Sequence, residues 1–578
     1  MRDFPRTVRF GRLNRAINHR RGNIIVLSAL LMVLMMFVLA MSIDVGYIYT
    51  MQAQLDRAVD AAALAGVQDL VNGTDAAQAK AAEYLCRNPV GSSMTFIDET
   101  QLAGQLTTFK SQHSSDYQMK AGSWNTTTRS FSETSVTPSA LQVTMTYPNM
   151  PFFFGRALGK DTFTVTSSAT AMFQPRDIMV VLDYSASMND DSTFARIGLL
   201  GRSAVETSLQ NCWNDLGPPS YGNLQFTPQW AVASGQAANV GSKIPHITVE
   251  YRNTAVYVTC THALTSVKLT FSGGATQTIS SSASSGTFQG SGSNSGDTIT
   301  KVKVTSWSNN GETFDFTSNT TFINALGLNN VTYPYAGGSW SDYIDYATGG
   351  SSTNASAGYE YKFGGMNLVE YWLDWHPSYA AWADGWKVRA EPQYALKDAM
   401  GVFMDFIGSV DTNDRVGLVV YDSTSGNATL ESALTNTYST ISNIVSHRQA
   451  GHYHDYTNIG AGMKLARQQL ESTARANSCK LIVLITDGLA NFYNGSYNLS
   501  AAHQQILDEA NSSLADKYKI MTLSVGIMAD TATMQTVADT TKGVAYVVPG
   551  GSDHQSMHDN LKKAFQDIAN ARPMLLVQ

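Results

Sequence analysis

The sequence contains little cysteine and little positive charge. Its 4 cysteines among 578 residues are too few and too scattered for a disulfide scaffold or a cysteine-based zinc site. Cys212 and Cys260 lie in one region and would allow one disulfide in an oxidising compartment, whereas free or buried thiols are an equally good interpretation. The formal net charge of -7 argues against nucleic acid as a partner, because phosphate binding needs a concentrated basic face.

Catalytic signatures are also missing from the sequence. It has no glycine-rich phosphate loop, no Gly-x-Ser-x-Gly elbow and no cysteine in a recognisable catalytic setting. We therefore expect a binding protein and not an enzyme. A hydrolase hidden in the middle of the chain is the weakest alternative, because no acid–base pair or nucleophile is visible there.

The chain does contain enough apolar side chains to bury several cores. Hydrophobic residues make up 43% of the sequence and charged residues 15%, which excludes a disordered or fibrous protein. The length predicts about three or four domains. Ser, Thr, Asn and Gly dominate many stretches, as is common in proteins that work outside the cytoplasm.

The N-terminus combines a basic segment, residues 1–22, with an apolar segment, residues 23–43. The uncharged run from Ile24 to Ile43 would form a helix about 30 Å long, enough to cross the hydrocarbon core of a membrane. Arginines before this run predict a cytoplasmic N-terminus, with the chain after Asp44 periplasmic or extracellular. A cleavable signal peptide is the alternative, but the apolar run is longer than a typical signal core.

Residues 44–71 continue this helix with an alanine-rich segment. A seam of alternating 4-3 spacing joins Ile48, Leu55, Val59, Ala62 and Gly66, and Gln52 interrupts it. Such a seam can associate with another helix or pack inside the same chain. Residues 72–174 then indicate a small α+β spacer, with a helix near 76–84 and strands around 141–147 and 162–173.

Three short motifs in this region carry a family resemblance. They are Arg21-Gly22 before the apolar run, Asp44-Val45-Gly46 just after it, and the alanine-rich run Asp60–Gly66. Together they resemble the N-terminus of the TadE/TadG-like proteins of tight-adherence (Flp) pilus systems. The resemblance implies a single-pass protein of the bacterial inner membrane. Leu27 stands where prepilin-type processing usually has a glutamate, so we do not expect a processed pilin subunit.

From Asp177 the pattern changes to short buried strands that alternate with amphipathic helices. This alternation predicts a Rossmann-like α/β domain with a parallel sheet. Expected strands lie at 177–183, 415–422, 480–488, 519–526 and 544–548, and expected helices at 392–407, 459–475, 501–515, 531–540 and 557–569. We place this domain in residues 175–191 and 386–578.

Nearly two hundred residues separate the first strand from the first good helix, far more than a βα loop needs. We therefore predict a β-rich, sandwich-like insertion at residues 192–385. Its middle, His246–Trp307, alternates like strands, and Gly273-Gly274 makes a plausible hairpin turn. Every tryptophan except Trp124 lies in the insertion or at its edge, and we favour a core role for these side chains over a ligand-contacting surface.

One constellation of residues carries chemistry. Asp183, Ser185 and Ser187 follow the first strand, Thr457 stands at the mouth of a helix, and Asp487 ends a later strand. Loops at the carboxyl ends of neighbouring parallel strands meet in one crevice. Oxygen-only ligands of modest charge suit a hard divalent cation, Mg²⁺ first, with Mn²⁺ or Ca²⁺ as alternatives. Such a cation can keep one coordination position open for an acidic group of a partner protein.

In this order and setting, the motif resembles the von Willebrand factor type A family and its metal-ion-dependent adhesion site. The resemblance covers Asp177–Met188 and about 392–575, and all five positions match. It implies that Asp183, Ser185, Ser187, Thr457 and Asp487 hold the metal. Further carboxylates at Asp190, Asp191 and Asp422 could extend the site, although solvated turn residues are the simpler interpretation of Asp190 and Asp191.

Histidines supply two weaker candidates. His452 and His454 lie on one side of an extended stretch before Thr457, but polar loop residues are the simpler interpretation. His554 and His558 have helical spacing without the glutamate of a zinc hydrolase motif, and so we predict a surface helix there.

Both resemblances together predict an envelope protein that assembles or anchors a tight-adherence pilus and binds pilus or envelope components through the metal. The alternative is a surface adhesin or sensor unrelated to pili, whose insertion recognises glycan or matrix.

Overall fold

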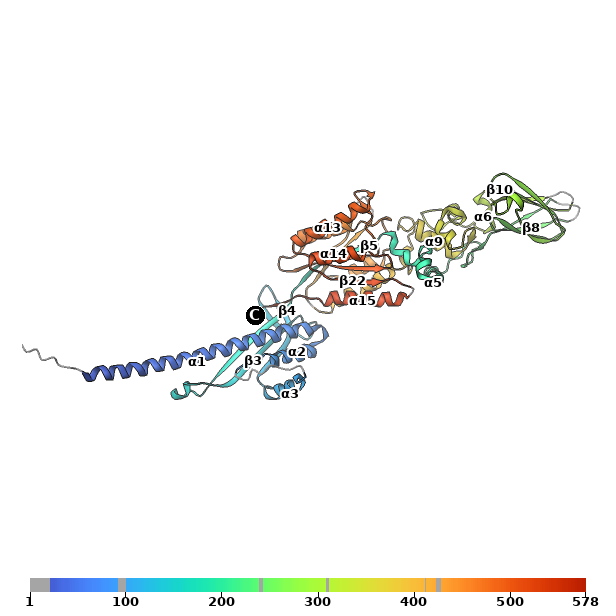
Figure 1. Cartoon of the computed structure of the whole chain (residues 1–578). Helices are drawn as coiled ribbons and strands as arrows, with labels where there is room; N and C mark the ends of the chain where they lie inside the picture. Colours follow the sequence, from blue (N-terminus) through green and yellow to red (C-terminus); the bar gives the residue numbers. More distant parts are fainter. Residues whose placement is uncertain are drawn as a thin grey trace, which may run out of the picture. The chain divides into compact units, whose positions relative to one another are not determined.

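The computed structural model describes residues 21–91, 100–238, 243–307, 311–410, 412–422, 428–551 and 553–577. Residues 1–20 of the predicted cytoplasmic segment, 1–22, lie outside these ranges. The chain divides into two compact units, and each is described by itself. Unit 1 comprises Met1–Phe173 with Met574–Gln578, and unit 2 comprises Gln174–Pro573. Figure 1 labels their elements.

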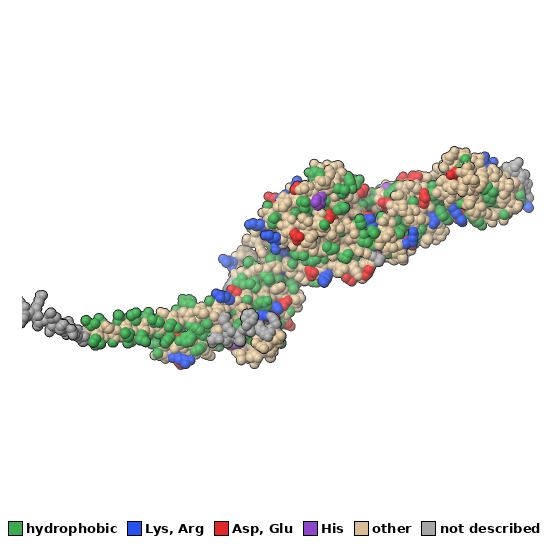
Figure 2. All heavy atoms as spheres, viewed as in Figure 1, with side chains coloured by type: hydrophobic (Ala, Val, Ile, Leu, Met, Phe, Trp, Pro, Cys, Tyr) green, Lys and Arg blue, Asp and Glu red, His purple; other side chains and the backbone are tan. Residues whose placement is uncertain are grey.

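Unit 1 begins with one continuous helix, α1 (Arg21–Gln68). The apolar part of this helix has a mean hydropathy of 3.0 and is 0% buried, and hydrophobic atoms cover it in Figure 2. By length and composition it is suited to crossing a membrane. The predicted membrane segment 23–43 and the alanine-rich segment 44–71 therefore share a single helix as far as Gln68.

The seam along the second half of α1 is buried within unit 1. Leu55, Val59 and Ala62 are fully buried, and α1 packs on α2 (Thr74–Arg87), β3 (Ala140–Pro151) and β4 (Thr162–Phe173). A Cβ on Gly66 would meet Leu141 Cδ2 at 2.3 Å, so only glycine allows this approach. Gln52 donates to the carbonyl oxygen of Thr166 at 3.1 Å. The seam thus packs inside the same chain.

The sheet of unit 1 is antiparallel, with the order β2-β1-β3-β4-β23. Its other elements are η1 (Asp69–Asn72), α3 (Leu102–Gln112), β1 (Tyr117–Asn125), β2 (Ser130–Glu133), η2 (Gly155–Leu158) and β23 (Met574–Leu576). The strand β23 pairs with β4, with Leu575 opposite Met172. The last residues therefore belong to unit 1, and the predicted α/β domain ends before Met574 instead of at 578.

The six-stranded sheet of unit 2 has the order β17-β16-β5-β18-β21-β22. Its strands are β5 (Arg176–Asp183), β16 (Arg415–Tyr421), β17 (Thr429–Thr435), β18 (Cys479–Thr486), β21 (Lys519–Gly526) and β22 (Ala545–Pro549). Five of them are parallel, and they lie where the sequence predicts strands. The unpredicted β17 pairs antiparallel with β16 at the sheet edge, which the short link between them allows.

Helices cover both faces of this sheet. One buried core joins it to α10 (Gln393–Gly408), α11 (Tyr438–Ser446) and α15 (His554–Asn570). A second core joins it to α12 (Ile459–Thr473), α13 (Leu499–Ala515) and α14 (Thr531–Thr541). All of these except α11 begin and end within three residues of the predicted helices. The chain therefore has the predicted α/β architecture, with helices on either side of a mostly parallel sheet.

The middle of the insertion is a sandwich of two antiparallel sheets, ordered β11-β10-β13-β14 and β12-β9-β8-β7, whose inner faces share one buried core. The strands are β7 (Val232–Gln236), β8 (His246–Tyr251), β9 (Ala255–Cys260), β10 (Leu264–Phe271), β11 (Thr276–Ser280), β12 (Ser285–Gln289), β13 (Ile299–Ser306) and β14 (Gly311–Asp315). The predicted hairpin turn joins β10 to β11, with Gly274 at a φ of 80°.

The rest of the insertion is helical, which the prediction of a β-rich insertion missed. It contains α4 (Ile197–Leu200), α5 (Arg202–Asp215), α6 (Asn319–Ala325), α7 (Trp340–Asp345), α8 (Ser352–Ser356) and α9 (Gly365–Trp375), with a two-stranded pair, β6 (Gln229–Trp230) and β15 (Lys362–Phe363). Most of these helices are too short for a helical period to show in the sequence.

Aromatic side chains form much of the core of this helical part. Trp213, Trp340, Trp372 and Trp382 are buried, as the core interpretation expects, whereas Trp375 is 40% exposed. Cys212 and Cys260 are both free, as are the other cysteines, so the structure holds no Cys212–Cys260 disulfide.

Candidate metal centre

The first strand of the unit 2 sheet ends at Asp183, and the turn after it folds back onto this carboxylate. The Ser185 backbone N–H donates to Asp183 Oδ1 at 2.9 Å, and the Ser185 hydroxyl donates to the same oxygen at 2.6 Å. Asp183 and Ser185 are fully buried. The turn thus fixes the aspartate and the first serine in one geometry.

A second aspartate, Asp487, follows the neighbouring strand β18 and joins the same network. The Ser185 and Ser187 hydroxyl oxygens lie 3.0 Å apart, and the Ser187 hydroxyl donates to Asp487 Oδ1 at 2.9 Å. A chain of hydroxyls therefore connects the two carboxylates. Adjacency of β5 and β18 in the sheet places their carboxyl ends together, as the topological argument predicts.

Thr457 lies at the same edge of the sheet, two residues before α12. It is 3% exposed, and its backbone N–H donates to Asn491 Oδ1 at 2.8 Å. Thr457, Ser187 and Asp487 line one pocket of about 250 Å³. No hydrogen bond joins the Thr457 side chain to another predicted ligand in the described ranges. Four of the predicted residues are thus linked directly, and Thr457 lines the same pocket as Ser187 and Asp487.

The electrostatics of the site are unfavourable without a cation. Burial raises the pKa of Asp183, against the hydrogen bonds from Ser185, Thr486 and Tyr421. Burial, and then the nearby charge of Asp183, raise the pKa of Asp487 well above its ordinary value. Two carboxylates that share a buried site repel each other, and a cation between them would remove this cost.

Two further side chains contact the Asp183 carboxylate, and neither contact was predicted from the sequence. The Thr486 hydroxyl donates to Asp183 Oδ2 at 3.0 Å, and the Tyr421 hydroxyl lies 3.2 Å from the same oxygen. Tyr421 stands at the end of β16, on the other side of β5. The sequence points to the neighbouring Asp422 because a carboxylate suggests a ligand, whereas a tyrosine at a strand end carries no such signal.

The first and last residues of the insertion lie beside this site, where the chain leaves the α/β domain and returns to it. The Asp191 N–H donates to the carbonyl oxygen of Glu391 at 3.1 Å, and the Glu391 N–H donates to the Ser192 hydroxyl at 2.9 Å. Asp190 and Asp191 line the pocket, so they are not freely solvated turn residues. Burial raises the pKa of Asp190 to about 6, and Asp190 pairs with Arg196 at 2.7 Å.

The histidine candidates do not form metal sites. The His452 ring is buried and stacks on Tyr379, with 5.1 Å between ring centroids, and burial lowers the pKa of His452 to about 4. His454 is exposed. No group of three His, Cys, Asp or Glu side chains suited to a metal was found among the described residues.

His558 corrects the prediction of a surface helix. It is 8% exposed, and its Nε2 lies 2.8 Å from Glu391 Oε1 while its Nδ1 lies 3.2 Å from Asp398 Oδ2. The helix α15 packs on α10, and this contact buries the face that carries His558. Helical spacing alone cannot show which face of a helix is covered.

The chemistry of the donors fits a hard cation. When the Ser185 hydroxyl donates its hydrogen bond to Asp183 and the Ser187 hydroxyl donates its hydrogen bond to Asp487, both hydroxyl oxygens keep lone pairs for a metal. Hydroxyl and carboxylate oxygens are ligands that Mg²⁺ accepts, while sulfur and imidazole are absent from the set. The pocket beside Ser187 leaves room for water or for a group from a partner.

Comparisons with protein families match three stretches of the chain. The von Willebrand factor type A domain matches residues 386–560, the Flp pilus-assembly TadE/G-like family matches residues 22–69, and the Tad-like Flp pilus-assembly family matches residues 61–171. The chain therefore combines a TadG-like N-terminal region with a von Willebrand factor type A domain. This combination supports a pilus-related role with protein partners, and type A domains often bind a divalent metal.

The chain is also similar over part of its length to several solved structures. BatB from Bacteroides thetaiotaomicron is 18% identical, with a TM-score of 0.22, over 30% of this chain and 88% of that one. An aerotolerance-related membrane protein from Bacteroides fragilis is 19% identical, with a TM-score of 0.22, over 29% and 89%. The pilus adhesin SpaC from Lactobacillus rhamnosus GG is 13% identical, with a TM-score of 0.24, over 31% and 28%. No curated protein matches the chain.

Proposed function

We propose that the chain is an inner-membrane protein that binds a component of a tight-adherence pilus or of the envelope through a metal-ion-dependent adhesion site. The observation that carries the proposal is the hydroxyl chain from Asp183 through Ser185 and Ser187 to Asp487. Oxygen ligands suited to a cation, beside a pocket with room for a partner group, support binding without chemical turnover.

The metal would be held by Asp183, Ser185, Ser187, Thr457 and Asp487. The bound cation supplies an electrophilic position that accepts a carboxylate oxygen. Tyr421 and Thr486 orient Asp183, and Asn491 fixes the backbone of Thr457, so the donors are preorganised before a ligand arrives. With few and mostly neutral donors, the cation keeps enough charge to attract an acidic side chain of the partner.

The membrane anchor and the Tad-type region supply the setting of this proposal. With the N-terminus in the cytoplasm, α1 would carry unit 1 and unit 2 outside the membrane, where pilus components are handled. An accessible C-terminal tag on intact cells or spheroplasts is the expected result of labelling from outside. A tag that reacts only after the inner membrane is opened would contradict this orientation.

A matched pair of threonines in α12 and its entry loop tests the metal site. Thr457 precedes the helix, and the exposed Thr473 ends it. We expect Mg²⁺ at 100 times its Kd to stabilise the full-length chain by about 2.7 kcal/mol. The Thr457→Ala variant should lose most of this thermal shift, and Thr473→Ala should keep it.

The same variants test the partner. In envelope extracts of the host, Mg²⁺-dependent capture of pilus or envelope proteins should disappear with Thr457→Ala or with chelator and persist with Thr473→Ala. Capture that is equal in all three conditions would show that binding does not pass through the metal. Loss of piliation in a Thr457→Ala strain, with normal amounts of the protein, would tie the site to pilus assembly.

A second candidate function is glycan recognition by the insertion. A groove of about 700 Å³ runs between the edge strands β7 and β14. Trp230, Gln225, Gln229, Asn324 and Glu312 line it, and no hydrogen bond ties up the last four side chains in the described parts of the chain. Free amides and a carboxylate beside an indole ring suit a ligand with many hydroxyl groups.

Trp230 and the exposed Trp375 give a matched test of this groove. Binding of the full-length chain to an oligosaccharide array is expected to fall at least tenfold with Trp230→Ala. It should persist with Trp375→Ala, because Trp375 is exposed but lies outside the groove. Binding to extended peptides instead of glycans would assign the groove to strand addition at β7 or β14.

A further inference from the structure

The turn between β3 and β4 exposes apolar side chains to solvent. This turn, residues 152–160, is called the hairpin tip. Phe153 is 62% exposed, Phe154 47% and Leu158 57%. Exposed Arg156 and Lys160 lie in the same turn. Clustered apolar side chains are costly in water, and such a cluster beside basic residues marks an interaction surface.

Asp44 fixes the hairpin tip to α1. Its carboxylate accepts backbone N–H bonds from Phe153 at 2.9 Å, from Phe154 at 3.1 Å and from Gly155 at 2.6 Å. Asp44 is 6% exposed. One turn further along α1, the Tyr47 ring packs edge-on against Phe153, with 4.8 Å between centroids. The tip therefore has a defined height along the helix.

That height coincides with the end of the apolar run. Asp44 directly follows Ile43, the last residue of the run, and Ile24 and Ile43 are 68% and 44% exposed. Figure 1 shows the hairpin running beside α1 toward its N-terminal half. If α1 spans a bilayer, the tip lies at the headgroup layer, where aromatic rings and long basic side chains are favoured.

We propose that the hairpin tip docks into the headgroup layer of the membrane that α1 crosses. Phe153, Phe154 and Leu158 enter the interface between headgroups and acyl chains, and Arg156 and Lys160 contact lipid phosphates. Continuity with the membrane-spanning run selects lipid as the occupant. Asp44 acts as a positioning residue. The consequence is that unit 1 is held against the bilayer at two points instead of hanging from one helix.

This inference rests on the proposed anchor, and labels at three positions separate the two claims. Cys86, Cys212 and Cys260 are buried, so replacing Cys479 by serine leaves an added cysteine as the reactive one. A fluorophore is attached to Leu158→Cys in the tip, to Leu34→Cys in the apolar run, or to Val136→Cys. Val136 is 74% exposed and precedes β3 at the end away from the tip.

The full chain is placed in nanodiscs of phosphatidylethanolamine and phosphatidylglycerol, with one copy per disc. Nitroxide lipids should quench the labels at 34 and 158 at least threefold more than the label at 136, and aqueous iodide should quench mainly the label at 136. Strong lipid quenching at 34 with iodide quenching at 158 would overturn the tip proposal and leave the anchor intact. Absence of lipid quenching at 34 would overturn the anchor itself.

Asp44→Ala tests the positioning role. It should raise iodide quenching of the label at 158 at least twofold without changing the label at 34 or the Mg²⁺ response of unit 2. An unchanged label at 158 would show that Asp44 does not set the height of the tip. A label at 158 shielded from both quenchers would assign the tip to a protein contact and contradict docking into lipid.

Discussion

Asp183 ends β5, Asp487 follows the neighbouring strand β18, and each carboxylate accepts a hydrogen bond from a serine hydroxyl that also contacts the other serine. Without a cation, this arrangement brings two buried negative charges together. With a cation, the same charges become ligands. Whether the side chain at position 487 is a carboxylate or an amide should therefore decide two things: how much the cation-free site destabilises the fold, and whether it can bind a cation.

Asp487→Asn should separate these two effects. The amide removes one charge from the buried pair, and so we expect the cation-free protein to gain on the order of 1 kcal/mol, about 1 °C in the unfolding temperature of unit 2. The Mg²⁺ shift should vanish at the same time. Scanning calorimetry of the full chain in chelator and in Mg²⁺ measures both. A variant that is less stable in chelator would show that the repulsion is not relieved.

His558 should make the stability of unit 2 depend on pH. The hydrogen bond to Glu391 and, further, the contact with Asp398 raise the pKa of His558 above its ordinary value, against the effect of burial. A raised pKa in the folded state means that the stabilisation is complete below the unfolded value of about 6.5 and is lost as pH rises through the folded pKa.

The measurement is chemical unfolding of the full chain from pH 5.5 to 9. His558→Gln should cost roughly 2 kcal/mol at pH 5.5, since it removes hydrogen bonds between charged groups, and less as the pH rises. The exposed His454 provides the control, because His454→Gln should leave the profile unchanged. A cost of His558→Gln that is equal at both ends of the range would contradict the charged form.

At this scale the sequence predicted which candidate ligands lie close together better than it predicted the side chains that support them. Asp183, Ser187 and Asp487 could be brought together because parallel strands end at one edge of a sheet. Tyr421 and Asn491 could not, since a phenol at a strand end and an amide in a loop have no spacing rule. The burial of His558 depends on which face of α15 meets α10, and periodicity does not encode that contact.

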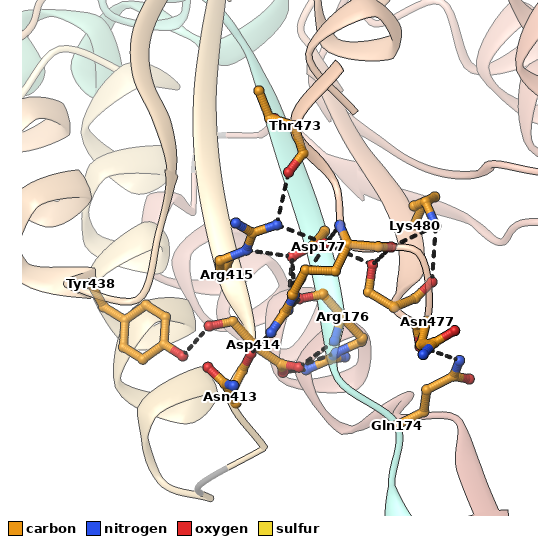
Figure 3. A network of polar contacts seen from close by, with 12 residues as sticks. Gln174, Arg176, Asp177, Asn413, Asp414, Arg415, Tyr438, Thr473, Asn477 and Lys480 are labelled. Carbon is orange, nitrogen blue, oxygen red and sulfur yellow. Dashed lines mark hydrogen bonds and ion pairs between the residues drawn. The ribbon is translucent and has the colours of Figure 1, made fainter. Parts of the chain in front are cut away.

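The opposite ends of the strands carry a different polar network, shown in Figure 3. Arg176, at the start of β5, is 1% exposed and donates to Asp414 Oδ2 at 2.8 Å, and the Asp414 carboxylate is fully buried. Beside it, Arg415 and Arg475 both pair with Asp177. The amino ends of β5, β16 and β18 are thus tied together at the edge of the sheet opposite the candidate metal centre.

Breaking the buried pair should destabilise unit 2 strongly. Asp414→Ala leaves the Arg176 guanidinium buried without its carboxylate, which costs about 3–5 kcal/mol. Replacing both residues, Arg176→Met with Asp414→Leu, should recover most of that loss because neither charge of this pair is left without the other. The exposed pair of Asp384 and Lys387 is the control, and Asp384→Ala should cost about 1 kcal/mol or less.

Urea unfolding of the four proteins measures these costs, and the Mg²⁺ response should persist in each folded variant because the network lies at the other edge of the sheet. A double variant as unstable as Asp414→Ala would show that the ion pair is needed for more than neutralising charge.

The sequence predicted those helices and strands whose apolar pattern extends over many residues. The parallel strands and α12–α15 show clear apolar periods, and the structure contains them at the predicted places. The helices α6, α7 and α8 have serine N-caps at Ser318, Ser339 and Ser351 but span only five to seven residues each. So short a helix shows less than two turns of any pattern, and tertiary packing stabilises it instead, through buried aromatic rings in α6 and α7.

At the scale of the whole molecule, the chain passes between its units twice, after Phe173 and after Pro573. Within unit 2, the two residues next to these crossings lie side by side, because the Gln174 N–H donates to the carbonyl oxygen of Pro573 at 2.7 Å. In unit 1 they continue as β4 and β23, which pair with each other. A pull on a ligand at the metal centre would therefore be shared by two strands of one sheet.

Removing residues 574–578 tests this double connection. The edge of β4 would lose its backbone partner, so the amide hydrogen of Met172, which stands opposite Leu575, should exchange at least tenfold faster in the truncated chain. The Phe173 N–H donates to the carbonyl oxygen of Ser139 on the β3 side and serves as an internal reference. The Mg²⁺ response of unit 2 should stay the same, since every donor lies before residue 488. Replacing Met574–Leu576 by three alanines is the control for the backbone: exchange should stay slower than in the truncation because β23 can still pair. Equal exchange in the full and truncated chains would mean that β23 adds nothing to unit 1 and that the load runs through β4 alone.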